Sequence, residues 1–192
     1  RHLHWVHGPP ESSLQYKSWY NKKRDELFLS LEQNGFVFEK ETAGELTPED
    51  KDRIKEKMGF KNWGNDTPTL KEITDAQQQL ALFSVVTDAL VQVFKDKKNV
   101  FPVFQKISFD RWMEVSSTNA NILISKISLK IDCPYAFLNM VINELDKGKI
   151  QVKTESMEVS KKANAKDYSE FPNVAATLSL SFQIINEKKV NQ

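Results

Sequence analysis

The sequence predicts an α+β fold in which one antiparallel sheet carries helices on one face. A long helical pattern over residues 70–95 is followed by two strand patterns, over 100–109 and 121–132. A second helical pattern begins at Pro134 and is again followed by two strand patterns, over 149–160 and 174–186. The last pattern alternates apolar and polar residues, which is typical of a strand with one buried and one solvated face.

Composition is that of an ordinary globular protein. The chain has 192 residues, of which 40% are hydrophobic and 28% charged, enough to bury a core without disulfides. A formal net charge of +1 provides no overall field for nucleic acid or anionic lipid, so neither is predicted as a partner. The sequence has no apolar run of about 18 residues or more, so we expect any membrane anchoring to come from a segment outside it.

The first part of the chain predicts a tail, a helix and a short strand. Residues 1–11 contain Gly8-Pro9-Pro10 and all three histidines, and we interpret them as a flexible tail. A helix follows over 12–33 and ends at Asn34-Gly35, because glycine tolerates the left-handed conformation needed there. Residues 36–39 then predict a short strand, so that 12–41 form an extra amino-terminal helix and strand.

Residues 42–68 are interpreted as an insertion. Thr47-Pro48-Glu49-Asp50 is a strong helix start, with a capping hydroxyl, proline in the first helical position and acids in the first turn. Gly59 is expected to end this short helix.

Residues 69–132 form the first predicted αββ unit. Its helix begins at a capping box, in which Thr69 caps forward and Glu72 caps back. In its second strand, Ile122 and Ile124 have the opposite parity to the apolar residues that follow. We therefore predict a bulge near Ser125-Lys126, or a later strand start.

Residues 133–186 form the second αββ unit. Its helix begins at Pro134 and stops at Gly148, and its two strands are joined by a polar loop over 161–173. Two αββ units side by side are a permuted relative of the ferredoxin-like arrangement. We expect residues 12–192 to form a single domain, with 187–192 as a tail.

Three stretches of the second half carry a resemblance to a known family. The stretch Leu129-Lys-Ile-Asp-Cys-Pro-Tyr-Ala-Phe-Leu-Asn-Met-Val-Ile-Asn-Glu-Leu145 resembles the PilO-like proteins, as do Ile150–Val159 and Ala176–Phe182. These are inner-membrane alignment proteins of type IV pilus systems, akin to the M component of type II secretion.

The front half resembles one branch of this group, the pilus-associated envelope proteins of Akkermansia. The similar features are a helix and strand over 24–38, the pair Gly59-Phe60 and the long helix over 70–95. The resemblance extends over about residues 20–186.

This resemblance implies a PilO-like α+β domain that acts as a non-catalytic protein–protein scaffold of a pilus or secretion assembly. The implied partners are other assembly proteins, with a homodimer as a further option, and no cofactor is implied. The implied location is the cell envelope, at the periplasmic side of the inner membrane or associated with that membrane through a segment absent from this chain.

The residues themselves do not predict an enzyme. His2, His4 and His7 all lie in the tail, which leaves no histidine for a catalytic triad in the folded part and makes a metal site there the weaker interpretation. Cys133, the single cysteine, has the apolar parity of its strand and is expected to be a small buried hydrophobic residue. No phosphate-binding loop or dinucleotide fingerprint occurs. Aromatics at 101, 104 and 109 lack the motif of an RNA-binding strand.

Five aromatic residues are the candidate partner interface. Tyrosine and tryptophan are enriched at interface hot spots, and the helix over 12–33 has more aromatics than one narrow core face needs. Ordinary packing is the alternative. The candidates are Tyr16, Trp19, Tyr20, Phe28 and Trp63. A second functional hypothesis is a surface-exposed module that binds a host receptor or glycan through the 42–68 insertion and the 161–173 loop.

Overall fold

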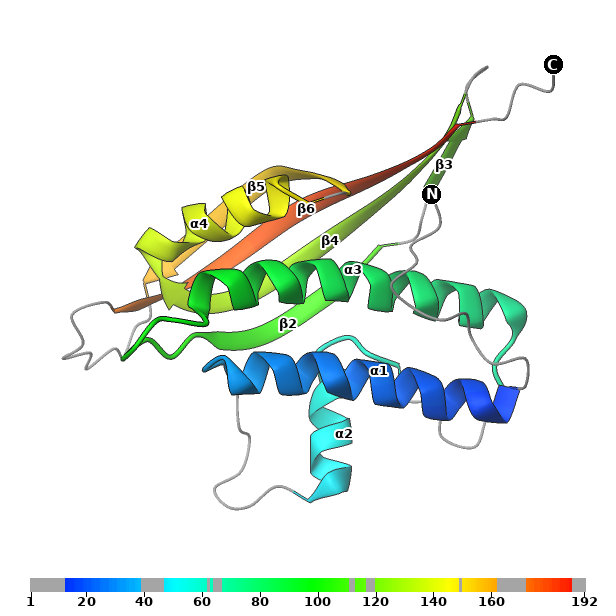
Figure 1. Cartoon of the computed structure of the whole chain (residues 1–192), viewed down its shortest axis with the longest axis horizontal. Helices are drawn as coiled ribbons and strands as arrows, with labels where there is room; N and C mark the ends of the chain where they lie inside the picture. The colour runs from blue at the N-terminus through cyan, green and yellow to red at the C-terminus, as the bar shows by residue number, and fades with distance from the viewer. Residues whose placement is uncertain are drawn as a thin grey trace.

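The computed structural model describes residues 13–38, 47–61, 63, 67–110, 113–116, 120–148, 150–161 and 172–187. Within this part, the helices are α1 (Ser13–Gln33), α2 (Pro48–Lys57), α3 (Leu70–Phe94) and α4 (Tyr135–Asp146). The strands are β1 (Val37–Phe38), β2 (Val103–Phe109), β3 (Met113–Ser116), β4 (Ala120–Pro134), β5 (Gln151–Lys161) and β6 (Asn173–Glu187). The predicted α+β class is confirmed (Figure 1).

The six strands form one sheet in the order β1-β2-β4-β6-β5, and β3 pairs with β4. The αββ units appear as α3-β2-β4 and α4-β5-β6, and every pairing within and between them is antiparallel. The extra strand differs, because β1 pairs with β2 in parallel. Strand β1 follows α1, and strand β2 follows α3. Because these two helices pack against each other, the chain enters the sheet in the same direction both times.

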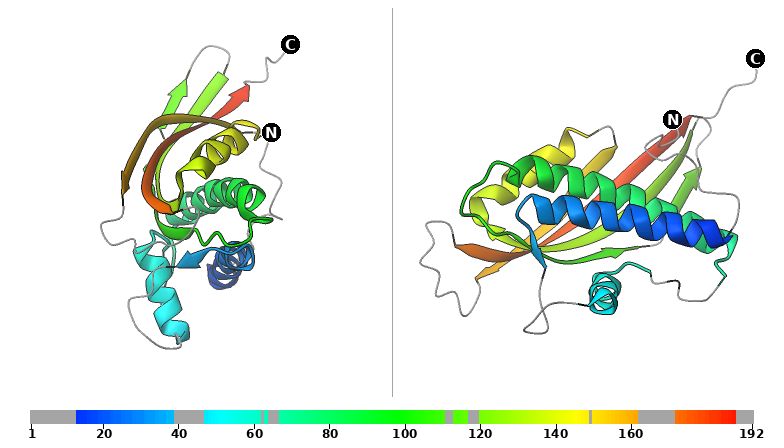
Figure 2. Two further views of the ribbon diagram at one scale, coloured as in Figure 1. Left: turned by 90° about the vertical axis from the view of Figure 1, so that its left-hand side faces the viewer. Right: turned by 60° about the horizontal axis from the view of Figure 1, so that its bottom comes forward.

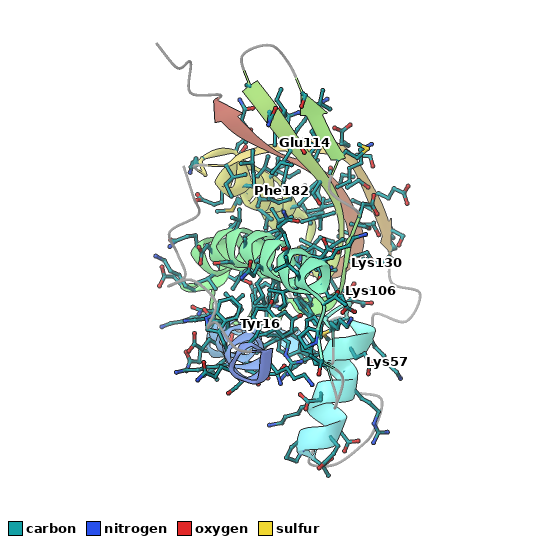
Figure 3. All side chains as sticks on the ribbon, turned by 90° about the vertical axis from the view of Figure 1, so that its right-hand side faces the viewer. Tyr16, Lys57, Lys106, Glu114, Lys130 and Phe182 are labelled. Carbon is teal, nitrogen blue, oxygen red and sulfur yellow. The ribbon has the colours of Figure 1, made fainter. Side chains whose placement is uncertain are left out.

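Helices α1, α3 and α4 lie on the same side of the sheet, with α3 between the other two (Figure 2). The segment after α2 instead runs along the edge of β2, where the Ile107 amide donates a hydrogen bond to the Met58 carbonyl at 3.1 Å. The predicted placement of helices on one face is thus confirmed for both αββ units. The opposite face of the sheet, called the outer face below, carries Lys106 and Lys130 as a cross-strand pair (Figure 3).

The core lies between this helical layer and the sheet. Its centre is a cluster of phenylalanine rings in which Phe83 of α3 lies 4.5 Å from Phe60, 5.2 Å from Phe28 and 5.8 Å from Phe104, measured between ring centroids. These rings come from α1, the segment after α2, α3 and β2, so a single cluster joins four parts of the chain. Apolar burial of this extent is the main force that holds such a fold together.

The predicted bulge near Ser125-Lys126 is wrong, and so is the later strand start. Strand β4 pairs with β6 without a register shift from Ala120 to Pro134. What changes near residue 125 is the partner on the other edge of β4, which is β3 up to Ile124 and β2 from Ile127 onwards. The change of parity therefore marks the point at which β4 extends beyond the helical layer. In the part of β4 that lies beyond the helices, the apolar residues do not all face the core.

The register shifts occur elsewhere, between Phe104 and Lys106 of β2 and between Thr154 and Ser156 of β5.

The capping box predicted at Thr69 is present, and the capping hydroxyl predicted at Thr47 belongs to a second capping box. In α2, the Thr47 hydroxyl accepts from the Asp50 amide, and the Asp50 carboxylate accepts from the Thr47 amide. In α3, Thr69 and Glu72 do the same. The Glu72 carboxylate also accepts a hydrogen bond from the Lys61 ammonium.

Glu72→Gln is expected to change how stability depends on pH. The Lys61 ammonium, followed by the amide and hydroxyl of Thr69, lowers the pKa of Glu72 from 4.5 to about 2. Because the folded-state pKa is depressed, this stabilisation is present above pH 4.5 and is lost as the pH falls towards 2. The difference in melting temperature between wild type and variant should therefore be largest near neutral pH and shrink across this range. Thermal unfolding followed by circular dichroism measures this difference, and Glu56→Gln, at an exposed position of α2, is the control. Melting temperatures of wild type and Glu72→Gln that differ by the same amount at every pH would contradict the prediction.

Candidate functional site

The five aromatic residues of the predicted interface are placed mainly inside the protein. Tyr16, Tyr20, Phe28 and Trp63 are buried, and Trp19 is half-buried. Phe28 belongs to the phenylalanine cluster, whereas the other four lie together between α1 and the first half of α3. Their burial favours the packing alternative, because a side chain buried within the chain has no surface left to offer a partner.

In the smaller cluster, aromatic side chains pack α1 against α3 (Tyr16 is labelled in Figure 3). Trp63 meets Tyr16 and Tyr20 edge-on, with ring centroids 6.0 and 5.9 Å apart, a geometry that aromatic quadrupoles favour. The Tyr16 hydroxyl donates to the Ile73 carbonyl at 3.1 Å, and the Lys61 ammonium lies 4.5 Å from the Trp63 ring. Burial raises the pKa of Tyr20 to about 12 and also raises that of Tyr16, so both hydroxyls stay protonated at physiological pH.

A charged network attaches α2 to α1. The Arg24 side chain is buried, and its Nη2 lies 3.0 Å from Asp52 while its Nε lies 3.0 Å from Asp25. The Lys55 ammonium contacts Asp25 at 2.7 Å. Each cation is therefore matched by a carboxylate of the other helix, which a buried guanidinium requires.

The loops proposed for receptor or glycan binding are described only in part. Within the 42–68 insertion, Met58, Phe60 and Trp63 are buried, so this part packs into the core. Residues 42–46, 62, 64–66 and 162–171 lie outside the described residues, as does the predicted tail with its three histidines.

Cys133 is buried where β4 meets α4, as its parity predicts. Burial, and secondarily the neighbouring Asp132 carboxylate, raises the pKa of its thiol to about 12. We expect native protein to react with Ellman's reagent about 10³-fold more slowly than unfolded protein at pH 8, because only the thiolate is nucleophilic. Absorbance measured with and without denaturant tests this, and rapid labelling of the folded chain would contradict a purely structural role.

Neither a metal-binding cluster nor a membrane-spanning helix is found among the described residues. No group of three or more histidines, cysteines, aspartates or glutamates in this part is arranged to hold a metal ion. Among the described helices, none combines the length and the apolar character needed to cross a bilayer.

The most exposed apolar surface on the sheet was not anticipated from the sequence. Strand β3, the start of β4 and the end of β6 form an arm that projects beyond the helices (Figure 1). Within it, Met113 and Val115 are 54% and 49% exposed, and the register places them opposite Ile124 and Ile122 on the outer face. In the described part of the chain, no strand pairs with the other edge of β3.

Strand β5, which ends the described sheet on the side opposite β1, has features that discourage pairing. Its register shift interrupts the regular ladder, and Lys153, Glu155, Glu158 and Lys161 are exposed along it. Bulges and charges are the usual protection of sheet edges. Strand β3 has no shift in its pairing and a single charged residue, Glu114, which makes its edge the more available of the two.

Comparisons with known proteins identify relatives of the fold. No protein-family model and no curated protein sequence matches the chain. A crystal structure from Akkermansia muciniphila aligns with a TM-score of 0.58 at 10% identity, covering 95% of this chain and 83% of that chain. A structure from the same organism, without its transmembrane region, aligns with a TM-score of 0.57 at 13% identity over 94% of this chain and 90% of that chain.

The type 4 fimbrial biogenesis protein PilO from Pseudomonas aeruginosa also matches, with a TM-score of 0.40 at 13% identity, over 90% of this chain and 98% of that chain. The fold that the sequence resemblance implies is confirmed by the two higher-scoring matches: the chain has the fold of these Akkermansia muciniphila structures.

Proposed function

We propose that this chain is a non-catalytic protein–protein scaffold of a type IV pilus or type II secretion-like envelope assembly. The assignment to a pilus or secretion assembly rests on the sequence resemblance to PilO-like proteins and their Akkermansia branch. The fold shared with the Akkermansia muciniphila structures supports that resemblance. The partners are other assembly proteins, or a second copy of the chain, met at the periplasmic side of the inner membrane.

The observation that carries the scaffold role is the arm with the free edge of β3. An unpaired strand offers a row of backbone donors and acceptors to a strand of another protein. Met113 and Val115 lie beside that edge on the outer face, where they add apolar area to such a contact. Large exposed apolar residues grouped in this way are typical of protein interaction sites.

The arm can dock a partner without disturbing the core. Met113 and Val115 point away from the helical layer, and the phenylalanine cluster lies at the other end of the strands, around Phe104. We therefore expect changes on the arm to affect binding and to leave stability nearly unchanged, within about 0.5 kcal/mol.

Capture from a detergent-solubilised cell-envelope extract tests this function. The double variant Met113→Lys/Val115→Lys should lose the pilus or secretion assembly proteins that wild type retains. Leu70→Lys/Val159→Lys is the matched control, since it places the same charges at exposed apolar positions on α3 and β5. Equal capture by both double variants, with both folded, would remove the arm from the proposed function.

A further inference from the structure

A second surface, separate from the arm, is an apolar groove. It lies between α1, β1 and α2 and has a volume of about 460 Å³. Its floor is apolar and is made by Phe28, Leu29, Phe36, Phe38, Ile54 and Met58. Leu29 is 50% exposed there, so part of this apolar surface faces solvent.

The groove lies beside the edge of β1 with which no described strand pairs. Strand β1 ends the sheet order, and in the described part it pairs only with β2. The Val37 amide is used in that pairing, where it donates to the Pro102 carbonyl at 2.8 Å. Because backbone amides alternate in direction along a strand, the amide of Phe38, which also lines the groove, is directed away from β2.

The rim of the groove has two charges that are not neutralised. Asp25 and Lys55 are paired with each other, but Glu32 on α1 and Lys51 on α2 make no ion pair with any described residue. Glu32 lies in the last turn of α1 and Lys51 near the start of α2, so each has the same sign as the helix dipole beside it. Glu32 is therefore available to a cation and Lys51 to an anion.

From these features we infer that the groove binds an extended peptide segment of a partner protein, added as a strand beside β1. The segment has a large apolar side chain for the floor, a basic residue towards Glu32 and an acidic residue towards Lys51. This inference deepens the proposed scaffold function, on which it rests for the source of the peptide. Groove and arm share no residue, so their variants separate a failure of one from a failure of the other.

Synthetic peptides provide the probe. Two fluorescent eight-residue peptides, blocked at both ends, have Val, Phe and Val at alternate positions. One peptide has an acidic residue near its amino end and a basic residue near its carboxyl end, and the other has these two charges in the reverse order. In fluorescence anisotropy with the whole chain, one order should bind. Leu29→Glu should weaken that binding by about tenfold or more, because it puts a charge against the apolar floor. Leu70→Glu, 80% exposed on α3, is the matched control and should bind within about twofold of wild type.

Two further measurements do not depend on the folding of Leu29→Glu. A peptide with N-methylated amides should lose binding to wild type, because it cannot extend the sheet. Lys51→Glu should weaken the probe by about two- to fivefold, and a probe with its acid replaced by lysine should regain that loss.

The inference is overturned if neither peptide order binds, if N-methylation has no effect, or if Leu29→Glu and Leu70→Glu behave alike. Sedimentation of the chain alone tests whether a second copy of the chain occupies the groove instead. A dimer that dissociates in the Leu29→Glu variant would assign the groove to a second copy and overturn the inference.

Discussion

Phe83→Ala should lower the free energy of unfolding by about 3–5 kcal/mol, the range for truncating a fully buried phenylalanine. Phe83 has no exposed surface, and its ring contacts those of Phe28, Phe60 and Phe104. Removing it leaves a cavity where α1, α3, β2 and the segment after α2 meet. The surrounding rings are held by different elements, so they cannot all collapse into that space.

Urea denaturation measures this loss as a shift of the midpoint at constant slope. Phe101→Ala is the control, because Phe101 is 64% exposed and should change stability by less than about 0.5 kcal/mol. A loss below about 1.5 kcal/mol for Phe83→Ala would contradict the central position of this ring.

Gly59→Ala should destabilise the protein by at least about 3 kcal/mol. Gly59 has φ +106°, and a Cβ atom built there would lie 2.1 Å from the Ile107 carbonyl oxygen. That oxygen belongs to the backbone of β2, which is fixed by its pairing with β4 and cannot move aside cheaply. The segment after α2 would have to leave the edge of β2, with loss of the hydrogen bond between Ile107 and Met58 and displacement of Phe60.

Gly35→Ala separates conformational strain from this clash. Gly35 has φ +89°, but its nearest Cβ contact is 3.9 Å away, at the Val100 carbonyl oxygen. It should therefore lose only the left-handed preference of glycine, about 1–2 kcal/mol. If Gly59→Ala and Gly35→Ala lower the free energy of unfolding by similar amounts in urea denaturation, the close approach of Gly59 to β2 does not contribute to the cost of the substitution.

The sequence predicts the helices and the long strands well because their periodicity extends over many residues. The capping boxes at Thr47 and Thr69 fix two helix starts to the residue. The alternation from Val174 onwards gives the core face of β6, on which Leu178, Leu180 and Phe182 are buried.

The features that the sequence does not reveal are those that depend on contacts between distant segments. Four residues, Met113 to Ser116, are too few for a period to identify β3, and its pairing with β4 depends on where β2 stops. The aromatic side of α1 could equally face a partner or α3, and only the tertiary fold places Trp63 against Tyr16 and Tyr20. The groove beside β1 likewise forms only when α1 and α2, distant in sequence, are brought together by Arg24 and Lys55.

Site-specific photocrosslinking in the cell of origin tests the central claim most directly. A photoreactive phenylalanine replaces Val115 at the free edge of β3 or, as control, the exposed Val159 of β5. Crosslinked proteins are then identified by mass spectrometry. The scaffold account predicts that position 115 captures defined pilus or secretion assembly proteins, or a second copy of the chain, and that position 159 does not. Capture from position 159 alone, or from neither position in folded protein at native abundance, would contradict a scaffold that works through the arm.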